Sequence, residues 1–223
     1  MARPQQFDRQ QVLARAMLLF WRRGYANTSI RDLTETTRLK PGSLYGAFKN
    51  KRTLFLQALD HYFSALNQEV STLLNTDAPP LERIRGFFEH LLEQAKADQE
   101  AKGCLLVNTL LEIPPDDTEI NRRIADMLLR IEARFCEALQ EAQDRGELAR
   151  DQSPNILASL LITGIFGLRI YDRVQTSAKR KKAVVDALLS VLPGGATEVP
   201  GSGSPPRHTG ALPEITGKTR DPA

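Results

Sequence analysis

The stretch LKPGSLYGAF, residues 39–48, brings together residue types that suit contact with a nucleic acid. Small residues let a backbone come close to another molecule, and serine and tyrosine hydroxyls donate hydrogen bonds to phosphates. Leu39, Leu44 and Phe48 recur at roughly helical spacing, so they can anchor one face of a short helix. The segment therefore predicts a helix that is held from behind and is thin on its outer first turn, where Pro41 pre-sets the backbone.

A second stretch, KGCLLVNTLLEI from Lys102 to Ile113, places a thiol within an apolar pattern. Cys104 lies near an expected helix start, and both the positive helix end and Lys102 favour the thiolate. Asn108 and Glu112 follow at i+4 and i+8, so a polar stripe on the face of Cys104 can line a pocket. The alternative is that Cys104 is a small buried hydrophobe, as free cysteines usually are.

The other reactive residue types show no spacing that indicates chemistry. Cys136 is 32 residues from Cys104, no CxxC or HExxH pattern occurs, and a disulfide is disfavoured in a reducing cytosol. The sequence has no evident nucleophile–base pair or phosphate-binding loop, which argues against an enzyme. We expect no metal site and no cofactor, since no ligand-spaced companions accompany the three histidines, His61, His90 and His208.

Charge is distributed unevenly along the 223 residues, although the net formal charge is only +3. Residues 1–52 hold eleven Lys or Arg against three acids, a balance of +8, whereas residues 53–192 hold sixteen against twenty-one, or −5. A basic module predicts a polyanionic partner, for which double-stranded DNA is one candidate. The alternative is chance unevenness in composition.

The overall composition is that of a soluble globular protein, with 41% hydrophobic and 26% charged residues. The length suits one domain or two closely packed ones. No run of about 18 apolar residues predicts a membrane span, and the first residues, MARPQQFDRQ, lack an apolar signal region. We therefore expect a cytoplasmic protein without a membrane partner.

Helical periodicity with short breaks runs along the chain, which predicts an all-α fold of about nine helices. Asp8 and Gln11 form a capping-box pattern at the first helix, and Gly24 is expected to end it. Thr28 and Asn50 are expected to cap the second and fourth helices. Further helices are expected at 80–98, 103–113, from Asp116 to Gly146, at 154–171 and at 178–192, and a disordered Pro- and Gly-rich tail at 193–223.

Residues 28–48 have the form of a helix-turn-helix, whose second helix lies in the major groove and presents its N-terminal residues to base edges. Tyr45 is expected to reach a phosphate over the rim of the groove, and Thr28 and Lys51 lie at helix starts, where phosphate is favoured. The predicted DNA-contacting residues are Thr28, Ser29, Arg38, Lys40, Pro41, Gly42, Ser43, Tyr45, Gly46, Ala47 and Lys51.

These motifs resemble those of the TetR family of bacterial transcriptional regulators. The matching stretches are GYANTSIRDL, KPGSLYGAF and NKRTLF, and the helical layout to Leu192 also fits. The resemblance implies a DNA-binding domain over residues 5–65, with its helix-turn-helix at about 29–48, and a ligand-binding and dimerisation domain over 66–192. One departure is the turn around Arg38, where the family usually has small residues and glycine. This turn position favours a left-handed conformation, which is costly for arginine.

The family also implies a homodimer whose last two helices form a four-helix bundle, and a repressor that an inducer releases from a near-palindromic operator. The helix expected at 154–171 supports a dimer independently, because it is apolar on nearly every side and a partner would cover it. The alternative is that it is the central core helix of one chain. The two recognition helices of a dimer are expected roughly 34–36 Å apart, about one turn of DNA.

The GCLL segment resembles one found in a TetR-like subset that includes members responding to electrophiles, oxidants or copper. We expect a small apolar or electrophilic inducer in a pocket near this segment. The basic run at 179–182 is expected to be the solvated start of the last helix rather than a nucleic-acid contact. The predicted sensor residues are Cys104, Asn108, Leu111, Phe135 and Phe166.

Two other functions stay as alternatives. One is a helical small-molecule-binding protein or carrier. The other is an interaction module without operator binding, for which Arg38 and the missing turn glycine are the support.

Overall fold

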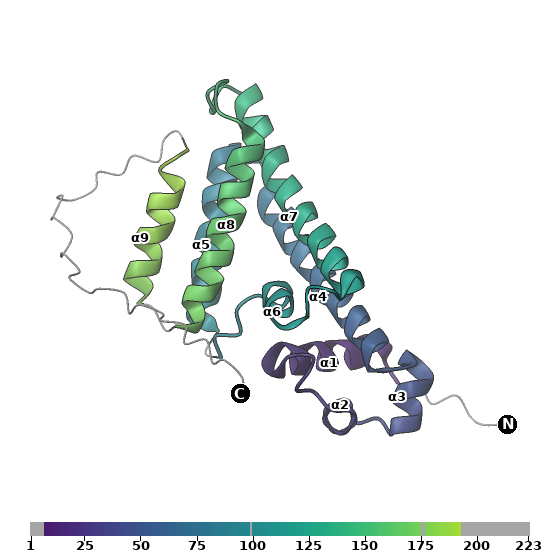
Figure 1. Cartoon of the computed structure of the whole chain (residues 1–223). Coiled ribbons are helices and arrows are strands. Elements are labelled where there is room, and N and C mark those ends of the chain that lie inside the picture. Colours follow the sequence, from purple (N-terminus) through teal and green to yellow (C-terminus); the bar gives the residue numbers. More distant parts are fainter. Residues whose placement is uncertain (1–6, 99, 175–176, 193–223) are drawn as a thin grey trace, which may run out of the picture.

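The computed structural model of the chain describes residues 7–98, 100–174 and 177–192, and these residues form nine α-helices and no strand (Figure 1). The all-α prediction is confirmed. The predicted tail at 193–223 lies outside the described residues. The helices are α1 (Arg9–Arg23), α2 (Ile30–Thr37), α3 (Pro41–Phe48), α4 (Lys51–Leu74), α5 (Pro80–Ala97), α6 (Leu105–Glu112), α7 (Thr118–Asp144), α8 (Pro154–Arg173) and α9 (Ala178–Leu189).

Helices α1, α2 and α3 form a small three-helix group around the first turns of α4 (Figure 1). Asp8 caps α1 by accepting the backbone N–H groups of Gln10 and Gln11, and Gly24 ends the helix at φ 82°, which glycine adopts readily. The prediction that Thr28 caps α2 is wrong. Ser29 is the cap, and it shares a reciprocal capping box with Asp32.

Helix α4 leaves this group and continues into the larger bundle formed with α5, α7 and α8, while α6 lies between that bundle and α1 (Figure 1). The expected domain boundary at 65/66 falls within α4, so one rigid helix belongs to both halves. Buried side chains form one continuous core that runs through both halves, from Phe20 and Phe55 to Phe88 and Phe135. A displacement in the larger bundle can therefore reach the small one through α4 itself.

The start of α7 differs by one residue from the expected one. Asp117, not Asp116, caps the helix by accepting the backbone N–H of Ile120. The other expected caps are confirmed: Asn50 accepts the N–H of Thr53 at α4, and Ser153 precedes Pro154 at α8. Asp116 is an exposed neighbour.

Helix α8 packs one face against α7 and leaves an apolar stripe of its other face exposed. The alternative that it is the central core helix of one chain is therefore wrong, and Ile156, at 69% exposure, shows this most clearly. By length and composition α8 could cross a membrane, but the core helix of a soluble protein passes the same test. The exposed apolar residues of α8 are Ile156, Leu160, Ile170 and Tyr171.

Candidate functional site

Helix α3 presents an open first turn. Lys40, Pro41 and Gly42 are exposed, and no atom of the residues that the structure describes lies within 4 Å of where a side chain on Gly42 or Gly46 would begin. Tyr45 is also exposed, at 43%. The walls of a DNA major groove can therefore come close to the backbone of α3. A recognition helix needs such an approach in order to contact base edges.

The inner face of α3 is anchored by Leu44 and Phe48, which are 2% and 1% exposed. Arg9 of α1 adds a second hold: its guanidinium donates to the Ala47 carbonyl at 2.9 Å and lies 4.4 Å from the centroid of the Phe48 ring. Sequence reasoning did not assign Arg9 a role, because the contact joins residues 38 positions apart and no local pattern signals it.

Arg38 adopts the left-handed conformation expected for this turn, with φ 60° and ψ 27°. A non-glycine residue there costs roughly 1–2 kcal/mol. Arg38 is exposed at this position, between α2 and α3, so its charge lies next to the first turn of α3. The turn keeps its shape despite the missing glycine.

The other predicted contact residues differ in exposure. Ser29 is exposed, Ser43, Ala47 and Lys51 are partly buried, and Thr28 is fully buried. The Thr28 hydroxyl donates to the Gly24 carbonyl at 2.6 Å, so its side chain is not presented to DNA. The Lys51 ammonium lies 4.4 Å from the centroid of the Tyr25 ring, and burial lowers the pKa of Lys51.

A carboxylate from the larger bundle binds the loop between α1 and α2. Glu112, the last residue of α6, accepts the backbone N–H of Tyr25 at 2.9 Å and that of Ala26 at 2.6 Å. A side chain on Gly24 would begin only 2.6 Å from a Glu112 oxygen, so glycine permits this approach. The sequence placed Glu112 on the Cys104 face, and its partners 86 and 87 residues away had no sequence signal.

A second contact joins the start of α4 to the start of α7. The Arg52 guanidinium donates to both carboxylate oxygens of Asp117 at 2.7 and 2.8 Å and to Glu119 at 2.7 Å. Hydrogen bonds from Arg52 lower the pKa of Asp117 to about 2. The paired charges fix α7 against the base of α4.

The predicted sensor residues do not line one cavity. Cys104 is buried at the N-cap of α6, and Asn108 donates to the Lys102 carbonyl at 2.8 Å. Phe135 is fully buried in the core against Phe87, with ring centroids 5.0 Å apart. Leu111 is 76% exposed, so the expectation that it lines a pocket with Cys104 is wrong. Phe166 is partly buried against the core.

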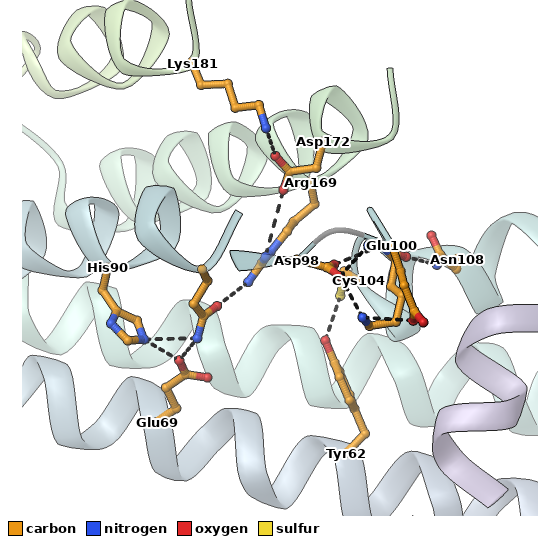
Figure 2. Close-up of polar contacts among 12 residues, drawn as sticks. Tyr62, Glu69, His90, Asp98, Glu100, Cys104, Asn108, Arg169, Asp172 and Lys181 are labelled. Atoms are coloured by element: carbon orange, nitrogen blue, oxygen red, sulfur yellow. Dashed lines mark hydrogen bonds and ion pairs between the residues drawn. The ribbon is translucent and has the colours of Figure 1, made fainter. Parts of the chain in front are cut away.

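The charge expected to favour a Cys104 thiolate is directed elsewhere. The Lys102 ammonium binds Asp98 at 2.6 Å and Glu100 at 3.3 Å, and the Cys104 sulfur accepts the Tyr62 hydroxyl at 3.7 Å (Figure 2). The second thiol, Cys136, donates to Asn155 at 2.9 Å, and burial raises its pKa. Burial therefore disfavours the thiolate form of Cys136.

A cavity of about 500 Å³ adjoins the Cys104 segment. Its walls come from α1, α4, α5, the loop before α6, and α8, and they include Gly103 and Tyr62, the residues that neighbour Cys104 in the chain and in space. Sequence reasoning missed this lining, including Trp21 and Arg169, because it is gathered from separate helices. None of the five predicted sensor residues lines this cavity or two larger hollows, one on α7 and α8 and one between α5 and α9. Asn108 lines a smaller hollow of about 230 Å³ beside Glu112.

The fold and the open face of α3 define a helix-turn-helix protein with a separate helical half. Residues 12–58 match the family model for bacterial regulatory proteins of the tetR family, and residues 80–188 match the tetracyclin repressor-like C-terminal domain. The chain belongs to the TetR family. It is a DNA-binding transcriptional repressor, and proteins of this family are not enzymes.

Individual relatives agree along most of the chain. The HTH-type transcriptional regulator YezE of Bacillus subtilis (strain 168) is 32% identical over 193 residues, which is 86% of this chain and all of YezE. The HTH-type transcriptional repressor ComR of Escherichia coli (strain K12) is 29% identical over 192 residues, 86% of this chain and 91% of ComR. A solved structure of a cysteine mutant of the regulator CifR with 26-bp operator DNA has a TM-score of 0.78 and 30% identity, and the match covers 86% of this chain and all of that one.

Proposed function

We propose that the protein acts as a homodimer in the bacterial cytosol, binds a near-palindromic operator through two copies of α3, and leaves it when a small molecule enters the larger bundle. The observation that carries this proposal is the open first turn of α3, anchored from behind by Leu44 and Phe48. The CifR complex supports the proposal that the partner is an operator, since that relative has the same fold and is bound to double-stranded operator DNA.

The exposed stripe on α8 supports the homodimer. Ile156, Leu160 and Ile170 follow one another at helical spacing, and exposed Val184 and Val191 lie on and just after α9. A contiguous apolar surface of this kind marks an interface, and a two-fold dimer covers both copies with one contact. Sedimentation of the full chain should show a dimer, and Leu160→Glu should shift it to the monomer; an unchanged dimer would reject this surface.

Operator binding is tested by a mobility shift with DNA from beside the protein's own gene. Lys51→Ala should weaken binding to all sequences and lower the slope of log affinity against log salt by about two, because each chain of the dimer loses one phosphate contact. Lys96→Ala on α5 is the control, since its ammonium pairs with Glu93 in the larger bundle. No preference over random DNA at low and moderate salt would sink the operator proposal, and an unchanged slope would remove Lys51 from it.

Release by a ligand has a structural route through α6. Glu112 connects α6 to the loop that precedes the helix-turn-helix, and α6 begins beside the 500 Å³ cavity. A ligand that shifts α6 changes the Tyr25 and Ala26 contacts and therefore the placement of α2 and α3. The reactive-thiol form of this proposal predicts that Cys104→Ser abolishes release; equal release in that variant leaves only non-covalent binding.

A further inference from the structure

The cavity beside Cys104 contains an arginine whose hydrogen-bonding capacity is only partly used. The Arg169 side chain is 19% exposed and lines the cavity from α8. Its Nη2 donates to the Gln94 amide oxygen at 2.9 Å, whereas its Nη1 lies 3.9 Å from Asp172, beyond hydrogen-bond distance. Asp172 is itself bound by Lys181 at 2.6 Å (Figure 2).

Two further donors on the walls of the cavity lack a strong acceptor. The indole Nε1 of Trp21 is buried and has no hydrogen-bond partner in the described part of the chain. Within the described ranges the Tyr62 hydroxyl donates to the Cys104 sulfur, a weak acceptor, and burial raises the pKa of Tyr62 well above its usual value, so the hydroxyl stays protonated. A buried donor without an acceptor is unfavourable, so this cavity has a surplus of donors.

The acidic groups on the walls are already engaged. Glu69 accepts from the Gln94 amide and lies 2.8 Å from His90, and Asp98 accepts the Lys102 ammonium (Figure 2). The carboxylates of Glu69 and Asp98 therefore already have partners within the chain, and they do not indicate a cation site. The rest of the lining is Met17, Ala65, Leu66 and Ala97, which are apolar, together with Gly103 and the imidazole of His61.

We propose that this cavity binds a small amphipathic carboxylic acid, with its carboxylate on Arg169 and its apolar body against Met17 and Leu66. An arginine fork matches a carboxylate in geometry and charge, and apolar walls with a few placed polar groups are typical of ligand sites of this volume. The inference rests on the proposed ligand response and names the class of inducer.

The same arginine offers a connection to the DNA-reading end. Gln94 joins Arg169 of α8 to Glu69 of α4, so an acid that draws the guanidinium into the cavity also pulls on the amide that contacts α4 (Figure 2). Helix α4 continues into the small bundle that carries α3. Occupation of the cavity is thereby linked to the position of the recognition helix.

Trp21 makes the experiment direct, because it is the chain's single tryptophan and lies on the cavity wall. The full-length protein is titrated with phenylacetate and octanoate, and separately with the neutral phenylacetamide and octanamide, while tryptophan fluorescence is recorded. We expect a saturable change with at least one acid and an affinity for its amide at least tenfold weaker. Arg169→Gln should weaken acid binding about tenfold to a hundredfold and leave amide binding unchanged.

Arg130→Gln is the matched control, since Arg130 is an exposed arginine of α7 outside the cavity lining. Arg169→Lys keeps the charge without the fork and should bind the acid with intermediate affinity, which guards against a folding defect in the glutamine variant. Equal affinity for acid and amide, full acid binding in Arg169→Gln, or no saturable change with either acid overturns the inference.

A parallel mobility shift separates this inference from the proposed function. Acid binding without release from the operator supports the site and removes the ligand-release proposal. Release by a neutral apolar compound, with neither acid bound, removes the carboxylate site and leaves ligand release intact.

Discussion

Helices α3 and α6 are both eight residues long, both apolar in sequence, and both begin without a side-chain cap, yet they have different surroundings. Helix α3 buries only Leu44 and Phe48 and leaves its first turn open. Helix α6 buries Leu105, Leu106 and Thr109. Its last residue, Glu112, accepts hydrogen bonds from the loop between α1 and α2. The open helix suits recognition of an external partner, and the enclosed one suits transmission within the molecule.

The polar residues of the two helices differ in the same way. On α3 the Tyr45 hydroxyl belongs to an exposed side chain, where an external partner can supply an acceptor. The polar side chains of α6 are used internally: Asn108 binds the Lys102 carbonyl and Glu112 binds two backbone N–H groups of another segment. The role of α3 can therefore be inferred from its own residues. The role of α6 depends on contacts with residues that are distant in the sequence.

The largest expected effect comes from the anchor of α3. Phe48→Ala should lower the free energy of unfolding by about 3–5 kcal/mol, because a fully buried ring leaves a cavity. Leu111→Ala in α6 is the control: it is exposed, so its cost should stay within about 0.5 kcal/mol. Chemical denaturation measures both. A costly Leu111→Ala would show that this face of α6 is covered in solution.

The next effect concerns the far end of α6. Glu112→Ala should cost about 1–3 kcal/mol, because the N–H groups of Tyr25 and Ala26 lose their acceptor. Thermal denaturation measures the loss, and a mobility shift measures the response to any inducer. Glu137→Ala, which removes an exposed carboxylate from α7, should leave both unchanged. If inducer response survived Glu112→Ala in full, α6 would not be the route of transmission.

A smaller effect tests whether the missing side chain at Gly42 allows DNA to approach α3 closely. Gly42→Ala should raise stability by about 0.5–1 kcal/mol, because the new methyl meets nothing within 4 Å and the unfolded chain loses freedom. Operator affinity should nonetheless fall about tenfold, because the added methyl group holds the backbone away from the bases, an effect comparable to one mismatched base pair at about 1–3 kcal/mol. Gly86→Ala on α5 is equally unhindered and should gain stability with no loss of affinity. Equal operator affinity in both variants would reject the assignment of Gly42.

The contrast between α3 and α6 also explains which features could be predicted from the sequence. The nine helices and the recognition helix were predictable because periodicity, caps and small residues act locally. The caps at Ser29 and Asp117 were each missed by one residue. Thr28 and Asp116 carry the same capping groups, and only the backbone conformation shows which residue of each pair is the cap. The Glu112 contact, the Arg9 hold on α3 and the cavity around Arg169 were not predictable, because each joins residues more than 35 positions apart.

The smallest expected effect tests the Arg52–Asp117 contact, which fixes α7 beside the DNA-reading half. The pKa of Asp117 is lowered to about 2 in the folded chain, below its usual 3.8, so the stabilisation is fully present above about pH 4 and is lost as pH falls toward 2. Asp117→Asn keeps a good cap and removes the charge, and it should cost up to about 1 kcal/mol at pH 7 after solvent screening. Urea midpoints from pH 7 to pH 3 should show this difference narrowing below pH 4. Asp116→Asn, the exposed neighbour, should show no difference at any of these pH values, and a cost at pH 7 that does not narrow in acid would mean that the cap, not the charge, is what Asp117 supplies.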